Sequence, residues 1–81
     1  MLEELKTAPK KTVGLKQTRK ALVDGAAASV FVARDAEARV RQPVLALCEE
    51  TGVPVFWADT MLELGRVCGI EVGAAVAAVL R

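Results

Sequence analysis

Residues 14–20 hold the side chains best suited to contact a nucleic acid. They read Gly-Leu-Lys-Gln-Thr-Arg-Lys and open a predicted helix that ends near residues 24–25. A glycine at a strand-to-helix turn lets another backbone approach closely, and a helix N-terminus offers free N–H groups to a phosphate. Lys16 and Gln17 lie four and three positions before Lys20, so they share a helix face. Cations there can meet phosphates, and the Gln17 amide can both donate to and accept from a base edge.

The charge distribution favours a local contact with a polyanion over non-specific binding by the whole surface. The net charge of the chain is only +1, but residues 1–41 hold nine Lys and Arg against five Asp and Glu, while residues 42–81 hold two against five. Five cations and no acid lie between Lys10 and Lys20. Such a patch can steer the protein toward a polyanion. The alternative interpretation of the same residues is a solvated basic helix face.

The composition argues against several classes of site. The chain has no histidine, and Cys48 and Cys68 lie twenty residues apart without a CxxC pattern, so we expect no zinc site or disulfide framework. Both thiols are expected to be reduced, small, buried side chains. With two Phe, one Trp and no Tyr, a base-stacking platform of several rings is not expected. No constellation of nucleophile and base is visible, so we expect a protein that is not an enzyme and has no cofactor or metal.

The hydrophobic pattern predicts alternating helices and strands. Strands are expected at residues 11–13, 29–33, 53–57 and 74–80, and helices at residues 2–7, 17–24, 38–51 and 61–67, the third becoming regular only near Gln42 because of Pro43. Asp59 or Thr60 is expected to cap the last helix. The predicted fold is α/β: a single domain over residues 1–81, built as a three-layer α-β-α sandwich with a small mixed four-stranded sheet. No segment is long and apolar enough for a bilayer, and we expect a cytoplasmic protein.

A second unusual stretch is the apolar loop before the last strand. Ile70 and Val72 flank Glu71 between Gly69 and Gly73. Loops usually lie in water, so this loop either folds back into the core or presents an apolar surface to a ligand. The glycine spacing fits neither a dinucleotide-binding fingerprint nor a P-loop.

Together these two stretches resemble the ribosomal protein L-seven-Ae family. Residues 14–20 resemble its GxNExxK-type segment, and residues 64–72, Leu-Gly-Arg-Val-Cys-Gly-Ile-Glu-Val, resemble its LG-x-x-x-GIEV loop. Residues 35–37 and 47–50 are similar to further landmarks of the family, and the order of elements matches over nearly the whole chain. The short bacterial members, which carry a GTKQT-type first motif where archaeal ones carry GTNEV, are the most similar.

The resemblance implies RNA binding, specifically of kink-turns, which are bulged stems with tandem sheared G·A pairs and an extruded nucleotide. It implies that Gly14 lies against the RNA backbone, that Lys16 and Gln17 face the sheared guanines, and that Lys20 lies near guanine edges and phosphate. It places Ile70, Glu71 and Val72 in the loop that covers the extruded base, with Glu37 nearby. On the strength of this second motif we expect Ile70 to be largely exposed in the free protein.

Two departures from the archaeal pattern concern the base-reading positions. Lys16 stands in place of Asn and Gln17 in place of Glu. A carboxylate accepts from guanine N–H groups more strongly than an amide does, and an added lysine attracts phosphate. We therefore expect softer base discrimination and a steeper salt dependence.

The expected partner is a structured ribosomal or regulatory RNA that contains a kink-turn, bound by a protein that is monomeric when free and has no membrane association. The alternative is a protein-interaction module on the same fold without RNA affinity of its own. In that case the basic helix face would be merely solvated.

Overall fold

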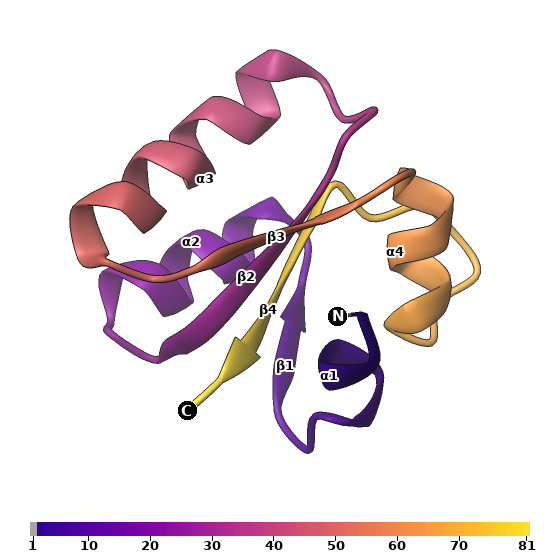
Figure 1. Cartoon of the computed structure of the whole chain (residues 1–81), viewed down its shortest axis with the longest axis horizontal. Coiled ribbons are helices and arrows are strands. Elements are labelled where there is room, and N and C mark those ends of the chain that lie inside the picture. The colour runs from indigo at the N-terminus through magenta and orange to yellow at the C-terminus, as the bar shows by residue number, and fades with distance from the viewer. Residues whose placement is uncertain (1) are drawn as a thin grey trace.

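Four helices and four strands alternate along residues 2–81, the part of the chain that the computed structural model describes (Figure 1). In chain order they are α1 (Leu2–Thr7), β1 (Lys11–Val13), α2 (Leu15–Val23), β2 (Ala27–Ala33), α3 (Ala38–Thr51), β3 (Val55–Ala58), α4 (Met61–Val67) and β4 (Val76–Leu80). This order is the predicted one, and the last segment is a strand as expected. None of these helices is long and apolar enough to cross a membrane.

The sheet is mixed, with the strand order β1-β4-β2-β3. β4 lies antiparallel between β1 and β2, whereas β3 runs parallel to β2 at the other edge. Because Val13 pairs with Ala77 and Val32 with Val76, the C-terminal ends of β1, β2 and β3 meet the start of β4 at one end of the sheet. We call this end, with its turns at residues 14, 34–37, 59–60 and 73–75, the loop end.

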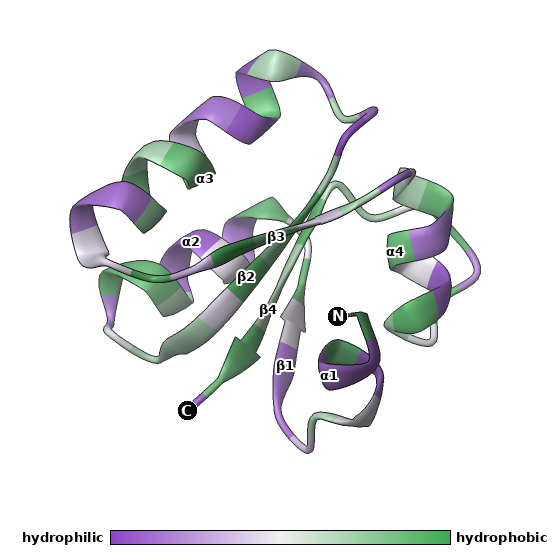
Figure 2. Cartoon of the chain, in the orientation of Figure 1, coloured by the Kyte–Doolittle hydropathy of each residue, from purple (hydrophilic) through white to green (hydrophobic). Residues whose placement is uncertain are grey.

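The two faces of the sheet carry separate cores, which confirms the predicted three-layer α-β-α sandwich. Val30 and Val32 of β2 pack toward α2 and α3, while Phe31 and Ala33 pack toward α1 and α4, and all four are fully buried. Figure 2 shows the apolar strands in the middle and the polar residues on the outer helices. A strand buried on both faces explains why residues 29–33 form a nearly continuous apolar run rather than an alternating one.

The boundary predictions fail at α2 and α3. α2 begins at Leu15, two residues earlier than expected. α3 is helical from Ala38, so the prediction that Pro43 delays its regular part until Gln42 is wrong. The first turn forms ahead of the proline because the Glu37 carbonyl accepts from the N–H groups of Val40 and Arg41. Pro43 itself is exposed, so its ring meets solvent rather than the core.

A buried hydroxyl pair fixes α2 against β1. The Oγ1 atoms of Thr12 in β1 and Thr18 in α2 lie 2.9 Å apart, and both residues are buried, Thr18 completely. Each hydroxyl can donate or accept, so the pair satisfies two polar groups within an apolar layer. The contact sets the position of the first turn of α2, which carries Lys16 and Gln17.

Removing one hydroxyl of this pair should cost more than removing both. Thr18→Val is expected to lower the free energy of unfolding by about 1–3 kcal/mol, because it leaves the Thr12 hydroxyl buried without its partner. The double variant Thr12→Val/Thr18→Val should recover part of that loss. Urea denaturation of the wild type, both single variants and the double variant measures the effect, and strictly additive losses would contradict it.

Candidate nucleic-acid interface

Gly14 forms the turn between β1 and α2 in a conformation that side chains disfavour. Its φ is +98° and its ψ 162°, and a Cβ atom added there would meet nothing within 4 Å. The glycine is therefore needed for its backbone angle and not for close packing within the chain. Its N–H donates to the Val76 carbonyl at 2.9 Å. The turn is thus tied to the start of β4 while the space above its Cα stays open.

The first turn of α2 keeps its N–H groups available. No side chain caps this end of the nine-residue helix, and its first turn holds no acidic residue. The first N–H groups of a helix have no intrahelical partner, and the helix dipole places partial positive charge there. This end of α2 therefore suits a phosphate.

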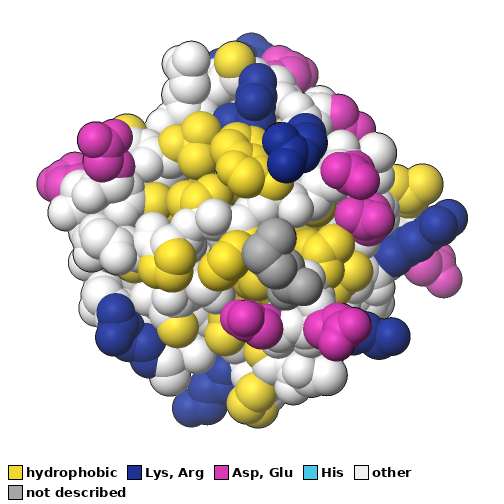
Figure 3. Space-filling model, viewed as in Figure 1, with side chains coloured by type: hydrophobic (Ala, Val, Ile, Leu, Met, Phe, Trp, Pro, Cys, Tyr) yellow, Lys and Arg dark blue, Asp and Glu magenta, His cyan; other side chains and the backbone are white. Residues whose placement is uncertain are grey.

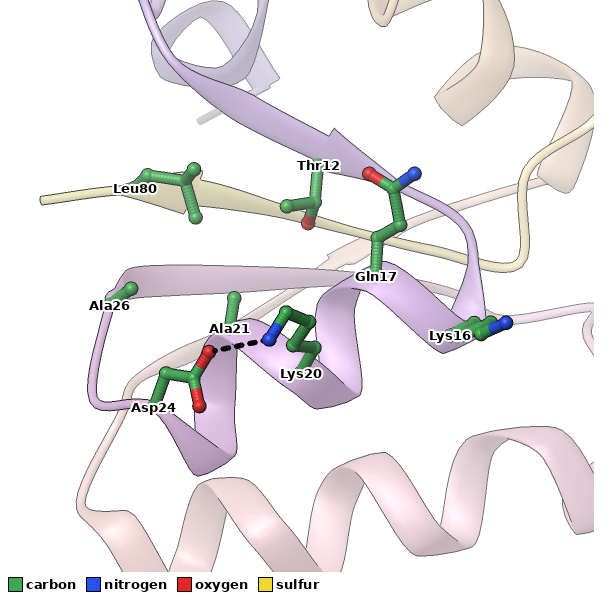
Figure 4. Close-up of a pocket in the computed structure, with 8 residues that line it drawn as sticks. All are labelled: Thr12, Lys16, Gln17, Lys20, Ala21, Asp24, Ala26 and Leu80. Carbon is green, nitrogen blue, oxygen red and sulfur yellow. Dashed lines mark hydrogen bonds and ion pairs between the residues drawn. The ribbon is translucent and has the colours of Figure 1, made fainter.

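Lys16, Gln17 and Lys20 line a groove between α2 and the β1–β4 edge. The groove has a volume of about 620 Å³, and its floor includes Thr12 and Ala21. Figure 4 shows Gln17 pointing toward β1, Lys16 pointing out at the turn, and Lys20 bent toward the far end of the helix. All three side chains are exposed, and they line the same groove.

The five cations between Lys10 and Lys20 differ in whether they have partners within the chain. The Lys11 ammonium donates to the Leu5 and Lys6 carbonyls at 3.2 and 3.4 Å, so it closes the C-terminal end of α1. Lys20 pairs with Asp24. Within residues 2–81, Lys16 and Arg19 form no ion pair and remain free for a ligand. Elsewhere the charges are mixed, and Figure 3 shows both signs around the visible face.

The turn after β2 places Glu37 at the loop end, at the N-terminus of α3. Its Oε2 atom lies 2.8 Å from the Arg39 Nε atom, so this carboxylate is already paired. Asp35, two residues earlier, accepts from the Met61 N–H at 2.8 Å and fixes the start of α4. That role of Asp35 could not be predicted from the local sequence, because its partner lies 26 residues away.

Two arginines flank this turn. The Arg34 guanidinium lies 5.5 Å from the centroid of the Trp57 ring and 3.7 Å, through Nε, from Asp59 Oδ1. The Arg41 Nε atom is buried and has no hydrogen-bond partner among the described residues. It is therefore a donor without an acceptor near the start of α3.

The apolar loop is held against α4 by two glycines. A Cβ atom on Gly65 would collide with the Val72 carbonyl oxygen, and one on Gly73 would lie 3.1 Å from Met61 Cβ. The Ile70 N–H donates to Gly65 O at 3.0 Å, and the Ala74 N–H donates to Met61 O at 2.9 Å. The loop therefore runs back along α4, from its C-terminal end to its start at the loop end of the sheet.

The expectation that Ile70 is largely exposed is wrong. Ile70 is half-buried and packs against the core under α1 and α4, whereas Val72 is 67% exposed and Glu71 is also exposed. The loop thus combines the two alternatives, because Ile70 packs toward the core and Val72 presents an apolar surface to solvent. The core-facing part follows from the contact of Ile70 with Gly65.

The predicted residues do not all share one face. Gly14 is bonded at the loop end to Val76, the first residue of the strand that follows the apolar loop. Lys20 and Ile70, however, each lie about one helical turn from that end, on opposite sides of the sheet, because α2 and α4 cover opposite faces (Figure 1). A ligand that touches both must wrap around the loop end.

The two cysteines are free thiols whose environments make them poor nucleophiles. Burial raises the pKa of the Cys48 thiol. Burial also raises the pKa of Cys68, against a smaller lowering by the Lys11 charge. Both are therefore protonated at neutral pH. Across residues 2–81, no group of three or more His, Cys, Asp or Glu is placed to hold a metal ion.

The chain matches the model of the ribosomal protein L7Ae/L30e/S12e/Gadd45 family over residues 1–81, and it belongs to this family. The RNA-binding protein TTE2299 of Caldanaerobacter subterraneus subsp. tengcongensis is 51% identical over 70 residues, which cover 86% of this chain and 85% of that protein. The RNA-binding protein YbxF of Geobacillus stearothermophilus is 44% identical over 79 residues, covering 98% and 96%.

A solved structure supports the same relationship. The Giardia lamblia 15.5kD RNA binding protein aligns with a TM-score of 0.88 and 27% identity, over 99% of this chain and 70% of that one. The similarity extends over both the Gly14 turn and the apolar loop. The resemblance found in the sequence is therefore confirmed at the level of the family and the fold.

The contact between α4 and the apolar loop makes Gly65 sensitive to a single methyl group. In a free helix, alanine is more favourable than glycine by up to about 1 kcal/mol. Here Gly65→Ala is expected to lower the free energy of unfolding by about 1–3 kcal/mol, because the loop backbone must move. Arg66→Ala, at the adjacent exposed position, is the control and should change stability by less than about 0.5 kcal/mol. Urea unfolding compares the two variants, and a Gly65→Ala protein at least as stable as the wild type would contradict the close contact.

Proposed function

We propose that this protein binds RNA and that the element it recognises is a kink-turn. Its family contains ribosomal proteins, and the relatives described above carry the name RNA-binding protein. The surface at the loop end supports the proposal, since it combines a polar helix N-terminus with an apolar loop. A bent RNA offers the matching pair of features, a phosphate backbone and an unstacked base.

One observation carries the proposal: the hydrogen bond from the Gly14 N–H to the Val76 carbonyl. It joins the turn that suits a sugar-phosphate backbone to the strand that follows the apolar loop. The two stretches are more than fifty residues apart in the chain, yet they meet at one end of the sheet. A binding surface made from both can contact backbone and extruded base at the same time.

The proposed roles follow the chemistry of the exposed groups. The first N–H groups of α2 and the unpaired Lys16 meet phosphates. Gln17 hydrogen-bonds to the edges of the sheared guanines. Val72 covers the extruded base, while half-buried Ile70 supports the loop from inside.

Three further residues of the predicted site have secondary roles. Lys20 adds charge one turn further along α2. Glu37 and Glu71 border the base from the two sides of the loop end. Because Glu37 is paired with Arg39, its carboxylate repels phosphates less than a free one would.

The alternative, a protein-interaction module with a solvated basic helix, has one observation in its favour. Lys11 and Lys20 already have partners within the chain, so the positive charge available to a polyanion is smaller than the sequence indicates. The two proposals differ in one measurable property. Only the RNA-binding protein should discriminate a kinked RNA from a straight one.

A gel-shift titration provides that test. The protein is expected to bind a kink-turn RNA at least tenfold more tightly than the same duplex without its bulge, because base contacts and the bend supply specificity beyond phosphate attraction. Equal affinity for both RNAs would refute kink-turn recognition. No binding to either RNA would favour the protein-interaction module.

Lys16 and Gln17 should contribute in different ways. Lys16→Ala is expected to lower the salt slope of binding by roughly one unit, since it removes one phosphate contact. Lys6→Ala removes the same charge from exposed α1 and should leave the slope unchanged. Gln17→Ala should instead cost about 1–3 kcal/mol of preference for G·A pairs over Watson–Crick pairs. Titrations across a salt series measure both effects, and parallel curves for wild type and Lys16→Ala would argue against the assignment.

The outward side of the apolar loop should matter for binding more than for folding. Val72→Ala is expected to leave the melting temperature within a degree or two and to weaken kink-turn binding by about 1–2 kcal/mol. Val23→Ala is the matched control, because Val23 is 71% exposed and Val72 67%, and Val23 lies at the far end of α2. Ile70→Ala should lower the melting temperature, since Ile70 packs against the core. If Val72→Ala and Val23→Ala bind alike, the loop does not cover the base.

A further inference from the structure

Lys20 is the only cation of the predicted site, among the described residues, that is bound to an acidic side chain. Its Nζ atom lies 3.2 Å from Asp24 Oδ2, one helical turn further along α2. Figure 4 shows the Lys20 side chain bent toward Asp24 and away from Lys16 and Gln17, with the ion pair lying along the groove. In this arrangement the ammonium points away from the loop end, where the proposed ligand binds.

The position of Asp24 has no explanation in helix stability. Asp24 is the C-cap of α2, where the helix dipole places partial negative charge and disfavours a carboxylate. The order of the pair, with lysine four residues before the acid, is also the weaker of the two orders in a helix. The side chains are 78% and 53% exposed, so solvent screens the attraction. An acid at this position contributes little to the fold.

We propose that Asp24 is a positioning residue that holds Lys20 back and thereby lowers the affinity of this surface for RNA; the inference rests on the proposed function. An exposed ion pair opens easily, so RNA can release Lys20 from Asp24. The released carboxylate then lies beside the RNA, which reduces the net gain from the new phosphate contact. Lys20 therefore adds less affinity, and less salt dependence, than a free lysine at the same position.

The consequence concerns polyanions in general. Non-specific binding depends almost entirely on cations that meet phosphates. Restraining Lys20 leaves Lys16 and Arg19 as the cations of α2 that, within residues 2–81, are free of ion pairs. The protein then relies more on the shape of the Gly14 turn and the apolar loop, and less on charge, to hold its RNA.

The test is a double-mutant cycle on kink-turn binding, measured across a salt series. Asp24→Asn should tighten binding about two- to fivefold at low salt and steepen the salt slope by up to about one unit. Lys20→Met keeps the aliphatic stem and removes the charge. In the Lys20→Met background, adding Asp24→Asn should give no gain, because Asp24 acts through Lys20. Glu50→Gln controls for the change in net charge, because Glu50 is an exposed residue of α3 that forms no ion pair within the described chain.

Each outcome of this cycle is informative. A gain for Asp24→Asn that vanishes in the Lys20→Met background supports the proposal. An equal gain in both backgrounds means that Asp24 repels phosphate directly, and no gain in either means that the pair does not restrain Lys20; both overturn it. A matching gain for Glu50→Gln also overturns it, because net charge then suffices. If the wild type fails to prefer the kink-turn over the straight duplex, the proposed function has failed, and this inference with it.

Discussion

The insertion of β4 between β1 and β2 is the constraint on which the rest of the structure depends. At the start of β4, the Ala75 carbonyl accepts from the Ala33 N–H at 2.8 Å and the Val76 carbonyl accepts from the Gly14 N–H at 2.9 Å. These two bonds fasten the ends of β2 and β1 to one short segment. The apolar loop connects α4 to β4, so the position of the start of β4 also fixes the course of this loop. Backbone bonds thus join the strands at the loop end, and the side chains of Asp35 and Thr60 add bonds that fix the start of α4.

Much of this fold was predictable because local patterns and global packing agree. The apolar run from Val30 to Ala33 required cover on two faces, and both core clusters supply it. Thr60 caps α4 through a bond from the Glu63 N–H to its Oγ1 at 3.0 Å, as its type and position indicated. The bounds of α3 were predicted correctly, but the expectation that Pro43 delays its regular part until Gln42 was wrong, because the first turn is already closed by bonds to the Glu37 carbonyl. The packing of Val44 and Cys48 into the core holds α3 together although Pro43 cannot donate a backbone hydrogen bond.

The candidate site was less predictable because its details depend on long-range contacts. Spacing placed Lys16, Gln17 and Lys20 on one helix correctly. The local sequence does not indicate that Asp35 fixes the start of α4. Nor does it show that a side chain at position 65 would collide with the backbone of the apolar loop. Ile70 shows the limit most directly, since an apolar residue in a loop can face either way. Its direction is decided by a bond to Gly65 O, whose position follows from the tertiary fold.

Counting charges also overstates what a surface offers to a ligand. Five cations lie between Lys10 and Lys20, yet one closes α1 and another is bound to Asp24. What remains is a small set of free groups beside a glycine with a positive φ and a helix without a side-chain cap at its N-terminus. The missing cap costs the fold stability, since a side-chain cap would satisfy N–H groups that are now left to solvent. Because the N–H groups at the start of α2 are left without a side-chain cap and no acidic residue lies in its first turn, this end of the helix can meet a polyanion.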